Sequence, residues 1–185
     1  AEQPGLSVVA SPDRGDGSRM SWVQMTDTPT GLDINFFDVQ GVSGTRPACG
    51  EANFVESNVA TGLSRPVPHT IKITMDLLEG PSNDVVKVYV DGKLKHSGTS
   101  WEDYFRYDCE AVAHLGNPPI VNRILYRTGG DPAPATSGKG FVIDNLSLGT
   151  LPAKDACKNG GWQSLTRADG SSFKNQGDCI QYTNT

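Results

Sequence analysis

Residues 69–97 decide the fold class, and they read HTIKITMDLLEGPSNDVVKVYVDGKLKHS. Over residues 69–77 apolar and polar side chains alternate, which is typical of a strand with one buried and one solvated face. The turn-forming run at 79–84 separates this stretch from a second alternating one. Asp91-Gly92 tolerates the positive φ of a two-residue hairpin turn, so residues 93–96 return as a third strand. We therefore predict a three-stranded antiparallel meander.

Shorter apolar or alternating stretches predict further strands around this meander. They lie at residues 6–10, 19–26, 32–37, 124–127 and 141–148. The helical candidate covers about residues 100–113, where Ser100 suits an N-cap with Asp103 as the reciprocal acid, and we expect a turn or two at most. Strands separated by turns rich in Gly and Pro predict an all-β fold, an antiparallel β-sandwich of jelly-roll type.

Composition excludes several classes of function. The 185-residue chain has a formal net charge of −5, whereas a protein that binds a phosphate backbone needs a basic face, so nucleic acid is disfavoured as a partner. No apolar run approaches the length of a membrane span. The chain also lacks the nucleophile elbow of esterases, a phosphate-binding loop and a dinucleotide fingerprint. These absences narrow the class of protein without naming an activity.

The character of the chain changes near residue 152. We assign residues 1–152 to the sandwich and 153–185 to a polar, glycine-rich tail, which we expect to be closed by a disulfide and too short to carry a core of its own. The four cysteines are Cys49, Cys109, Cys157 and Cys179.

The spacing of the four cysteines argues against a zinc site, because there is no C-x-x-C pair and no His at ligand spacing. Three pairings are open. The favoured one joins Cys157 to Cys179 and Cys49 to Cys109, and disulfides imply secretion. A catalytic thiol with a histidine base is the alternative, and nothing in the sequence places a His beside a Cys.

Several segments resemble a group of secreted bacterial proteins of the concanavalin A-like lectin and glucanase superfamily, the laminin-G-like jelly rolls. The segments are SPDRGDGSRMS at 11–21, PHTIK at 68–72, NDVVKVYVDG at 83–92, GTSWEDYFR at 98–106 and GKGFVIDNLSL at 138–148. The resemblance covers roughly residues 6–149, in a group without a settled activity. The tail is similar to a short module appended to many secreted actinobacterial proteins.

Members of this group extend further upstream than the present chain does. The resemblance therefore implies that the chain lacks N-terminal strands found in its relatives. A sandwich without those strands would expose a sheet edge or a core face. We expect a second chain or the tail to cover it.

The candidate catalytic residue is Glu102, if the protein is an enzyme. Glucanases of this fold carry acids on alternating positions of one strand that face the cleft. The nearest match here is Asp33, Asn35 and Phe37, or Asp38 at the strand end, and it lacks the Glu-x-Asp-x-Glu pattern. Glu102 is preferred because Trp101 and Tyr104 would give a sugar platform beside it. The alternative is that all these acids are ordinary solvated residues of turns and strands.

An aromatic cluster supplies the candidate glycan-binding residues. They are Trp101, Tyr104, Arg106 and Tyr107, with Phe105 between them. Sugars stack their apolar ring faces on Trp and Tyr, while an Arg among the aromatics takes hydroxyls. The alternative is that the aromatic side chains close one end of the sandwich core.

A structural calcium ion is the predicted cofactor. The run Phe141-Val142-Ile143-Asp144-Asn145 is similar to the last strand of jelly-roll carbohydrate-binding domains, whose Asp ligates calcium. Calcium takes six to eight oxygen ligands, so Asp144 needs partners, and Asn83 and Asp84 are the preferred ones, with Asp13 and Asp16 as further candidates. The alternative is that Asp144 accepts hydrogen bonds from loop backbone.

Taken together, these features predict a secreted carbohydrate-binding or cell-surface interaction module that binds a polysaccharide or another glycan. Two alternatives stay open. One is a polysaccharide-cleaving hydrolase or lyase, and the other is a structural domain that binds protein through an open sheet edge.

Overall fold

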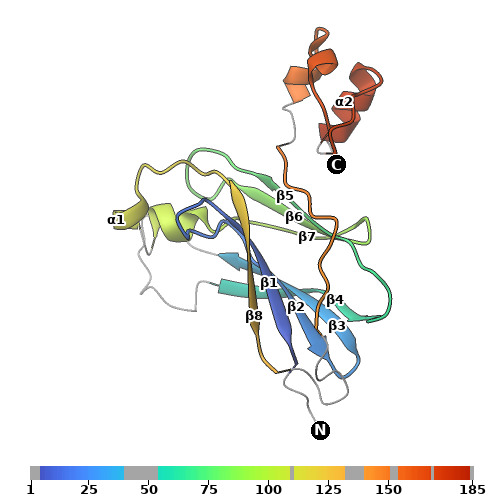
Figure 1. The fold of residues 1–185 in the computed structure, drawn as a ribbon. Helices are drawn as coiled ribbons and strands as arrows, with labels where there is room; N and C mark the ends of the chain where they lie inside the picture. The colour runs from blue at the N-terminus through green and yellow to red at the C-terminus, as the bar shows by residue number, and fades with distance from the viewer. Residues whose placement is uncertain are drawn as a thin grey trace. The chain divides into compact units, whose positions relative to one another are not determined.

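A computed structural model gives the fold of the chain (Figure 1) and describes residues 5–39, 54–108, 111–131, 140–150, 154–167 and 169–183. The chain forms two compact units, Ala1–Phe141 and Val142–Thr185. The first unit holds both β-sheets, and the second holds the cysteine-closed tail.

The larger sheet has five strands in the order β4-β3-β2-β1-β8, and every neighbouring pair is antiparallel (Figure 1). The strands are β1 (Ser7–Asp13), β2 (Val23–Thr28), β3 (Gly31–Val39), β4 (Phe54–Leu63) and β8 (Arg123–Gly129). The sequence predicted parts of β1, β2, β3 and β8. It missed β4, which is an edge strand with mostly polar or exposed side chains.

The smaller sheet is the predicted meander. It consists of β5 (Ile71–Asp76), β6 (Val85–Val90) and β7 (Lys93–Gly98), paired antiparallel in the order β5-β6-β7. Asp91 and Gly92 at the β6–β7 turn have φ of 51° and 74°. Both values are positive, as this two-residue turn requires. The prediction for residues 69–97 is confirmed.

The core lies between the two sheets. Val86, Val88 and Val90 of β6 are at most 2% exposed and pack in one cluster with side chains of the larger sheet. The buried members from that sheet are Val23, Ile34, Phe36 and Val59. Because strand side chains alternate, the polar residues between these positions point away from the core. The predicted all-β class, an antiparallel sandwich with a small disulfide-closed appendage, is confirmed.

Two short helical segments follow β7. They are η2 (Asp103–Tyr107), one turn of π-helix, and α1 (Ala111–His114). This agrees with the turn or two predicted over residues 100–113. Ser100 Oγ accepts a hydrogen bond from the Glu102 backbone N–H at 3.0 Å. Asp103 does not complete a capping box with Ser100 and instead accepts hydrogen bonds from Ser82.

The strand predicted at residues 141–148 is not formed, and that prediction is wrong. The alternation of Val142 and Ile143 with polar neighbours suits a strand, but Asn145 has a φ of 50°. A residue in the left-handed region interrupts an extended backbone, since consecutive strand residues need negative φ. The segment therefore stays irregular.

The second unit is organised by the predicted Cys157–Cys179 disulfide, which is present. It contains η4 (Lys154–Cys157), η5 (Gly161–Ser164) and α2 (Gln176–Thr183). Cys157, Cys179 and Phe173 are at most 4% exposed, with half-buried Trp162 and other apolar side chains around them. The expectation that the tail is too short for its own core is wrong, because the disulfide and Phe173 build a small one. Cys49 and Cys109 lie outside the described residues.

Arg167 adds a cation to the aromatic side of this small core. Its guanidinium lies 4.7 Å from the ring centre of Phe173 and 5.7 Å from that of Tyr182. The same group pairs with Asp178 at 2.6 Å.

Within the described parts of the chain, no helix is long and apolar enough to cross a membrane.

Replacing both Cys157 and Cys179 by Ser is expected to loosen the second unit alone. The lost constraint on the unfolded chain is worth about 3 kcal/mol for a loop of this length. Amide hydrogen exchange should accelerate over residues 154–183 and stay unchanged in the two sheets. Ser164→Ala, which removes one exposed hydrogen bond in the same unit, is the control. Unchanged protection of the tail in the double variant would contradict the assignment.

Candidate functional site

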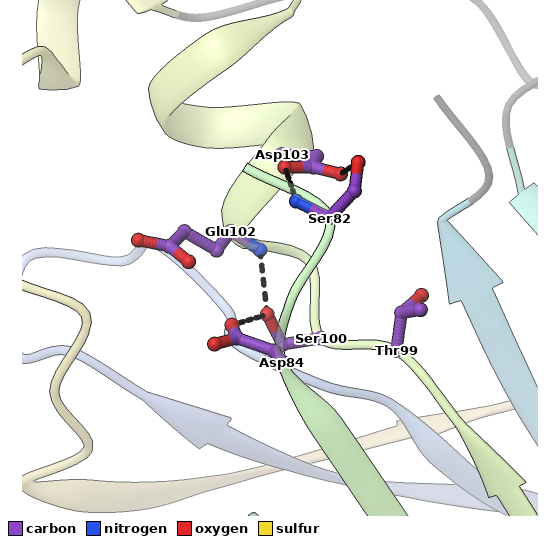
Figure 2. A pocket seen from close by; sticks show the side chains of 6 residues that line it. All are labelled: Ser82, Asp84, Thr99, Ser100, Glu102 and Asp103. Carbon is purple, nitrogen blue, oxygen red and sulfur yellow. Dashed lines mark hydrogen bonds between the residues drawn. The ribbon is translucent and has the colours of Figure 1, made fainter. Parts of the chain in front are cut away.

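The predicted catalytic residue Glu102 lies in a cluster of carboxyl groups at one end of the sandwich. Figure 2 shows Asp84 at the start of β6, Ser82 in the turn before it, and Ser100, Glu102 and Asp103 at the entry to η2. We call Asp84, Glu102 and Asp103 the carboxyl cluster. All three are at most 6% exposed.

Hydroxyl and backbone groups hold the carboxyl cluster in place. Asp84 accepts hydrogen bonds from Ser100 Oγ and, at 2.7 Å, from the Leu78 N–H. Asp103 accepts from the Ser82 N–H at 2.9 Å and from Ser82 Oγ at 2.7 Å (Figure 2). The cluster therefore ties the β5–β6 turn to the helical segment.

Glu102 is paired with one cation. Arg106 Nη1 donates to Glu102 Oε1, and Arg106 Nη2 lies 3.1 Å from Glu79 Oε2. Burial, together with the nearby charge of Asp84, nevertheless raises the pKa of Glu102 from its ordinary 4.5 to about 7. Asp108, 1% exposed, also has a raised pKa because of burial and of Asp103. The cluster can hold a proton at neutral pH.

The space beside the carboxyl cluster is small. The recess lined by Ser82, Asp84, Thr99, Ser100, Glu102 and Asp103 encloses about 150 Å³, part of it open solvent. The recess leaves no room for a water molecule to enter, so it is not a formed ligand pocket. Glu102 itself is only 2% exposed. The cluster as folded is therefore a proton-binding structural element, and direct contact between a sugar and Glu102 needs this recess to open.

The predicted glycan-binding aromatics lie mostly inside the protein. Trp101 is 5% exposed, stacks on Trp22 with ring centres 5.4 Å apart, and donates its indole N–H to the Phe37 carbonyl at 2.7 Å. Tyr104 is half-buried against Phe54, with ring centres 5.1 Å apart. Trp101 and Tyr104 belong to a second aromatic cluster with Trp22, Phe37 and Phe54, so they pack inside the protein and do not form an open platform.

Arg106 and Tyr107 stay next to Glu102. Arg106 is 6% exposed, and its guanidinium lies 5.3 Å from the ring centre of Tyr107, which is half-buried. The structure thus brings Glu102, Arg106 and Tyr107 together. The binding role of Trp101, Tyr104, Arg106 and Tyr107 stays a prediction.

The predicted calcium ligands belong to different units. Asp84 and Asn83 lie in the first unit, and Asp144 lies in the second, where Asn145 Nδ2 is 3.4 Å from its Oδ1. Both oxygens of Asp84 already accept hydrogen bonds, and Asn83 Nδ2 donates to the Glu79 carbonyl at 2.7 Å. Among the described residues, no three His, Cys, Asp or Glu side chains form a group that could hold a metal ion. Calcium stays a prediction.

A second candidate site lies on the face of the five-stranded sheet that points away from the smaller sheet, which we call the outer face. There Gln24 of β2, Asn35 of β3 and Asn58 of β4 stand in one row, because Gln24 pairs with Asn35 and Asn35 pairs with Asn58. We call these three side chains the amide row. Asn58 Nδ2 donates to Asn35 Oδ1 at 2.8 Å, and Asn35 Nδ2 donates to Glu56 Oε1.

A β-bulge in β4 places Asn58 on the outer face. Ile34 pairs with Ala60, but its neighbour Asn35 pairs with Asn58, so Val59 is the extra residue. Val59 is 8% exposed and belongs to the core cluster, whereas Asn58 is exposed. Without this extra residue, Asn58 and Ala60 would lie on the same face.

Aromatic side chains border the amide row. Phe37 pairs with Glu56 and Val39 with Phe54, and the Phe37 N–H donates to the Trp22 carbonyl at 3.2 Å. Trp22, Phe37 and Phe54 are half-buried on this face. The outer face therefore combines an edge of apolar rings with a strip of amide and carboxylate groups.

Sequence reasoning found only part of the outer face. The alternation Asp33, Asn35, Phe37 was noted as the nearest match to a strand of cleft-facing acids, and these residues do share the outer face. Asp38 points the opposite way, is 5% exposed, and accepts from His96 at 3.0 Å. Gln24, Glu56 and Asn58 were missed, since they come from other strands and β4 was not predicted.

Comparison with known proteins identifies no relative. No model of a protein family, no curated protein and no solved structure matches the chain.

The pH dependence of stability should report the buried proton on Glu102. Because the pKa of Glu102 is higher in the folded protein than its ordinary 4.5, the folded state holds the proton more tightly than the unfolded chain. The stabilisation is complete below about pH 4.5 and is lost as the pH rises through about 7, a change of about 3 kcal/mol in the free energy of unfolding.

Urea unfolding between pH 5 and pH 8 measures this effect. Glu102→Gln cannot ionise and should flatten the decline of the free energy of unfolding over this range, while the exposed Glu56→Gln should keep the wild-type slope. Curves of equal slope for Glu102→Gln and wild type would show that Glu102 ionises normally in the folded protein.

Proposed function

We propose that the chain is a secreted carbohydrate-binding module whose glycan lies across the outer face of the five-stranded sheet. The proposal includes membership of the concanavalin A-like superfamily, which the sequence resemblance and the two antiparallel sheets both favour. The disulfide in the second unit is compatible with secretion.

The amide row is the observation that carries this proposal. An amide side chain presents both a hydrogen-bond acceptor and two donors, as a set of sugar hydroxyls does. Neighbouring strands are about 4.8 Å apart, so Gln24, Asn35 and Asn58 spread such groups over about 10 Å across the sheet. A linear glycan running perpendicular to the strands would meet one amide after another.

Rigid strands favour the amide row over a loop site. Asn35 and Gln24 alternate with Ile34, Phe36 and Val23, which are at most 1% exposed, so the core fixes their backbone. The bond from Asn58 to Asn35 and the bond from Asn35 to Glu56 orient the amides before a ligand arrives. Preorganised groups lose less conformational entropy on binding. Half-buried Phe37, which lies on the same strand as Asn35, adds apolar surface for a sugar ring.

Asn35→Ala and Asn58→Ala should each weaken glycan binding about five- to tenfold, because each removes one or two hydrogen bonds of about 1 kcal/mol. A glycan array identifies the ligand, and titration calorimetry then gives the dissociation constants. Gln163→Ala, an exposed amide of the second unit, serves as the matched control and should bind normally.

The proposal fails if no glycan on the array binds, or if both Asn variants bind as tightly as the control. The same titrations in EDTA test the calcium prediction. Binding that is lost in EDTA and restored by Ca²⁺ would support a calcium ion, and binding indifferent to EDTA would remove calcium from the glycan site.

A glycan-cleaving enzyme is the second candidate, and the raised pKa of Glu102 favours it. A carboxyl group that is protonated near neutral pH suits the general acid of a glycosidase. Incubation with polysaccharides should then release new reducing ends, and Glu102→Gln should lower the rate at least a hundredfold. If wild type and Glu102→Gln release none, or release equal amounts, Glu102 is not a catalytic acid.

A further inference from the structure

Charge is distributed unevenly over the outer face. The row that contains Asn58, Asn35 and Gln24 continues across β1 and β8, because Gln24 pairs with Val9 and Val9 pairs with Arg127. Because β8 is the edge strand opposite β4, Arg127 stands at the end of the row opposite Asn58, and it is exposed. The five positions span four strand spacings, or about 19 Å. The amide row and Arg127 thus form a single line across the sheet.

Two acids of the outer face lie at the other end of this line. Glu56 of β4 and Asp33 of β3 lie on the same face as the amide row, because their pairing partners Phe37 and Thr26 do. Glu56 is already engaged by Asn35. The carboxylates of Glu56 and Asp33 would repel an anionic group of a ligand at this end. Such a group would therefore lie nearer to β8.

The β1–β8 half of the outer face is basic. Arg123 lies four residues before Arg127 on the same side of β8, and both Arg123 and Arg19 pair in register with Asp13. Asp13 is fully buried and accepts from Arg123 Nε at 2.6 Å. This half of the face therefore carries three arginines against one carboxylate, in a chain of net charge −5.

Arg127 is the arginine placed to contact a ligand. Arg123 is tied to Asp13, and the Arg19 guanidinium lies 5.1 Å from the ring centre of Trp22. Val9, an apolar side chain that is 5% exposed, lies between Arg127 and Gln24 in the row. Between Gln24 and Arg127 the row therefore contains no other charged residue, and a glycan bound along the amide row would pass over the Val9 position to reach Arg127.

We propose that the line from Asn58 to Arg127 selects an acidic glycan: the amide row binds the sugar hydroxyls and Arg127 binds a carboxylate or sulfate on the sugar at the β8 end. This inference rests on the proposed glycan-binding function. The planar guanidinium donates two parallel hydrogen bonds to a carboxylate or a sulfate, and few other side chains match that geometry. A neutral glycan would leave Arg127 in water and gain nothing from it.

Three hexasaccharides on one backbone separate the acidic group from the rest of the ligand. They are the β-1,4-linked glucose hexamer, its C6-carboxylate form and its C6-sulfate form. Titration of the full chain at low ionic strength should show one acidic form binding about tenfold tighter than the neutral one, the gain expected from a charge-assisted hydrogen bond. That preference should shrink when the ionic strength is raised.

Arg127→Gln should abolish the preference and leave binding of the neutral hexamer unchanged. Arg127→Lys should retain part of it, because the charge stays while the fork geometry is lost. Lys95→Gln, an exposed cation of β7 on the smaller sheet, is the matched control and should keep the full preference.

The outcomes separate this inference from the proposed function. If the neutral and both acidic hexamers bind equally, the acidic preference is overturned and glycan binding stands. If an acidic form binds more tightly and Arg127→Gln retains that preference, Arg127 is not the anion-binding group and the inference is overturned. If none of the three hexamers binds while the array yields another glycan, the outer face does not bind β-1,4-linked glucose. The inference is then overturned for this class of glycan. If the array is also empty, the proposed function falls as well.

Discussion

The contact between the two sheets is the constraint on which the rest of the structure depends. Val86, Val88 and Val90 of β6 are nearly inaccessible to solvent, and they face Ile34 and Phe36 of β3. Strand side chains alternate, so burying Ile34 and Phe36 forces Asn35 outward. The polar face and the core are therefore two results of one pairing register. A change that slipped β3 by one residue would bury the amides and expose the valine-packed surface.

At one end of the sandwich, buried charged side chains and not apolar ones hold two segments together. The carboxyl cluster places three buried acids near Arg106, a single buried cation. Burying unequal numbers of acids and bases is unfavourable unless a proton or many hydrogen bonds compensate. Here Ser82 and Ser100 donate to Asp103 and Asp84, and the pKa of Glu102 is raised to about 7, so that Glu102 takes up a proton near neutral pH. The junction between the β5–β6 turn and η2 thus depends on solution conditions more than the valine core does.

The sequence predicted the parts of the fold that are determined locally. Residues 69–97 contain their strands, their turn cluster and their hairpin turn within a short stretch, and all of these appear in the structure. β4 escaped prediction because its polar and exposed residues follow no simple alternation across the bulge at Val59. The strand predicted at 141–148 is absent although its residues do alternate, since a periodic pattern carries no information about the positive φ of Asn145.

The candidate sites show the same division between local and long-range information. Trp101, Tyr104, Arg106 and Tyr107 are near one another in sequence, but in the structure Trp101 packs among buried aromatic rings while Arg106 lies beside Glu102 and Tyr107. The row from Asn58 to Arg127 draws on five strands. Its members become neighbours only through pairing between residues far apart in the chain. No pattern within one segment could have indicated it.

The bulge at Val59 has a consequence for how this chain can change over evolution. β4 has two residues more than its partner β3 over the stretch they share, and one of these extra residues lies at Val59. The extra residue at Val59 keeps Asn58 and Glu56 outside while Val59 points inward. A point substitution in β4 would alter one side chain. A single-residue deletion there would instead invert the facing of every residue on one side of it. The number of residues between Phe54 and Ala60 is therefore as strongly constrained as their identity.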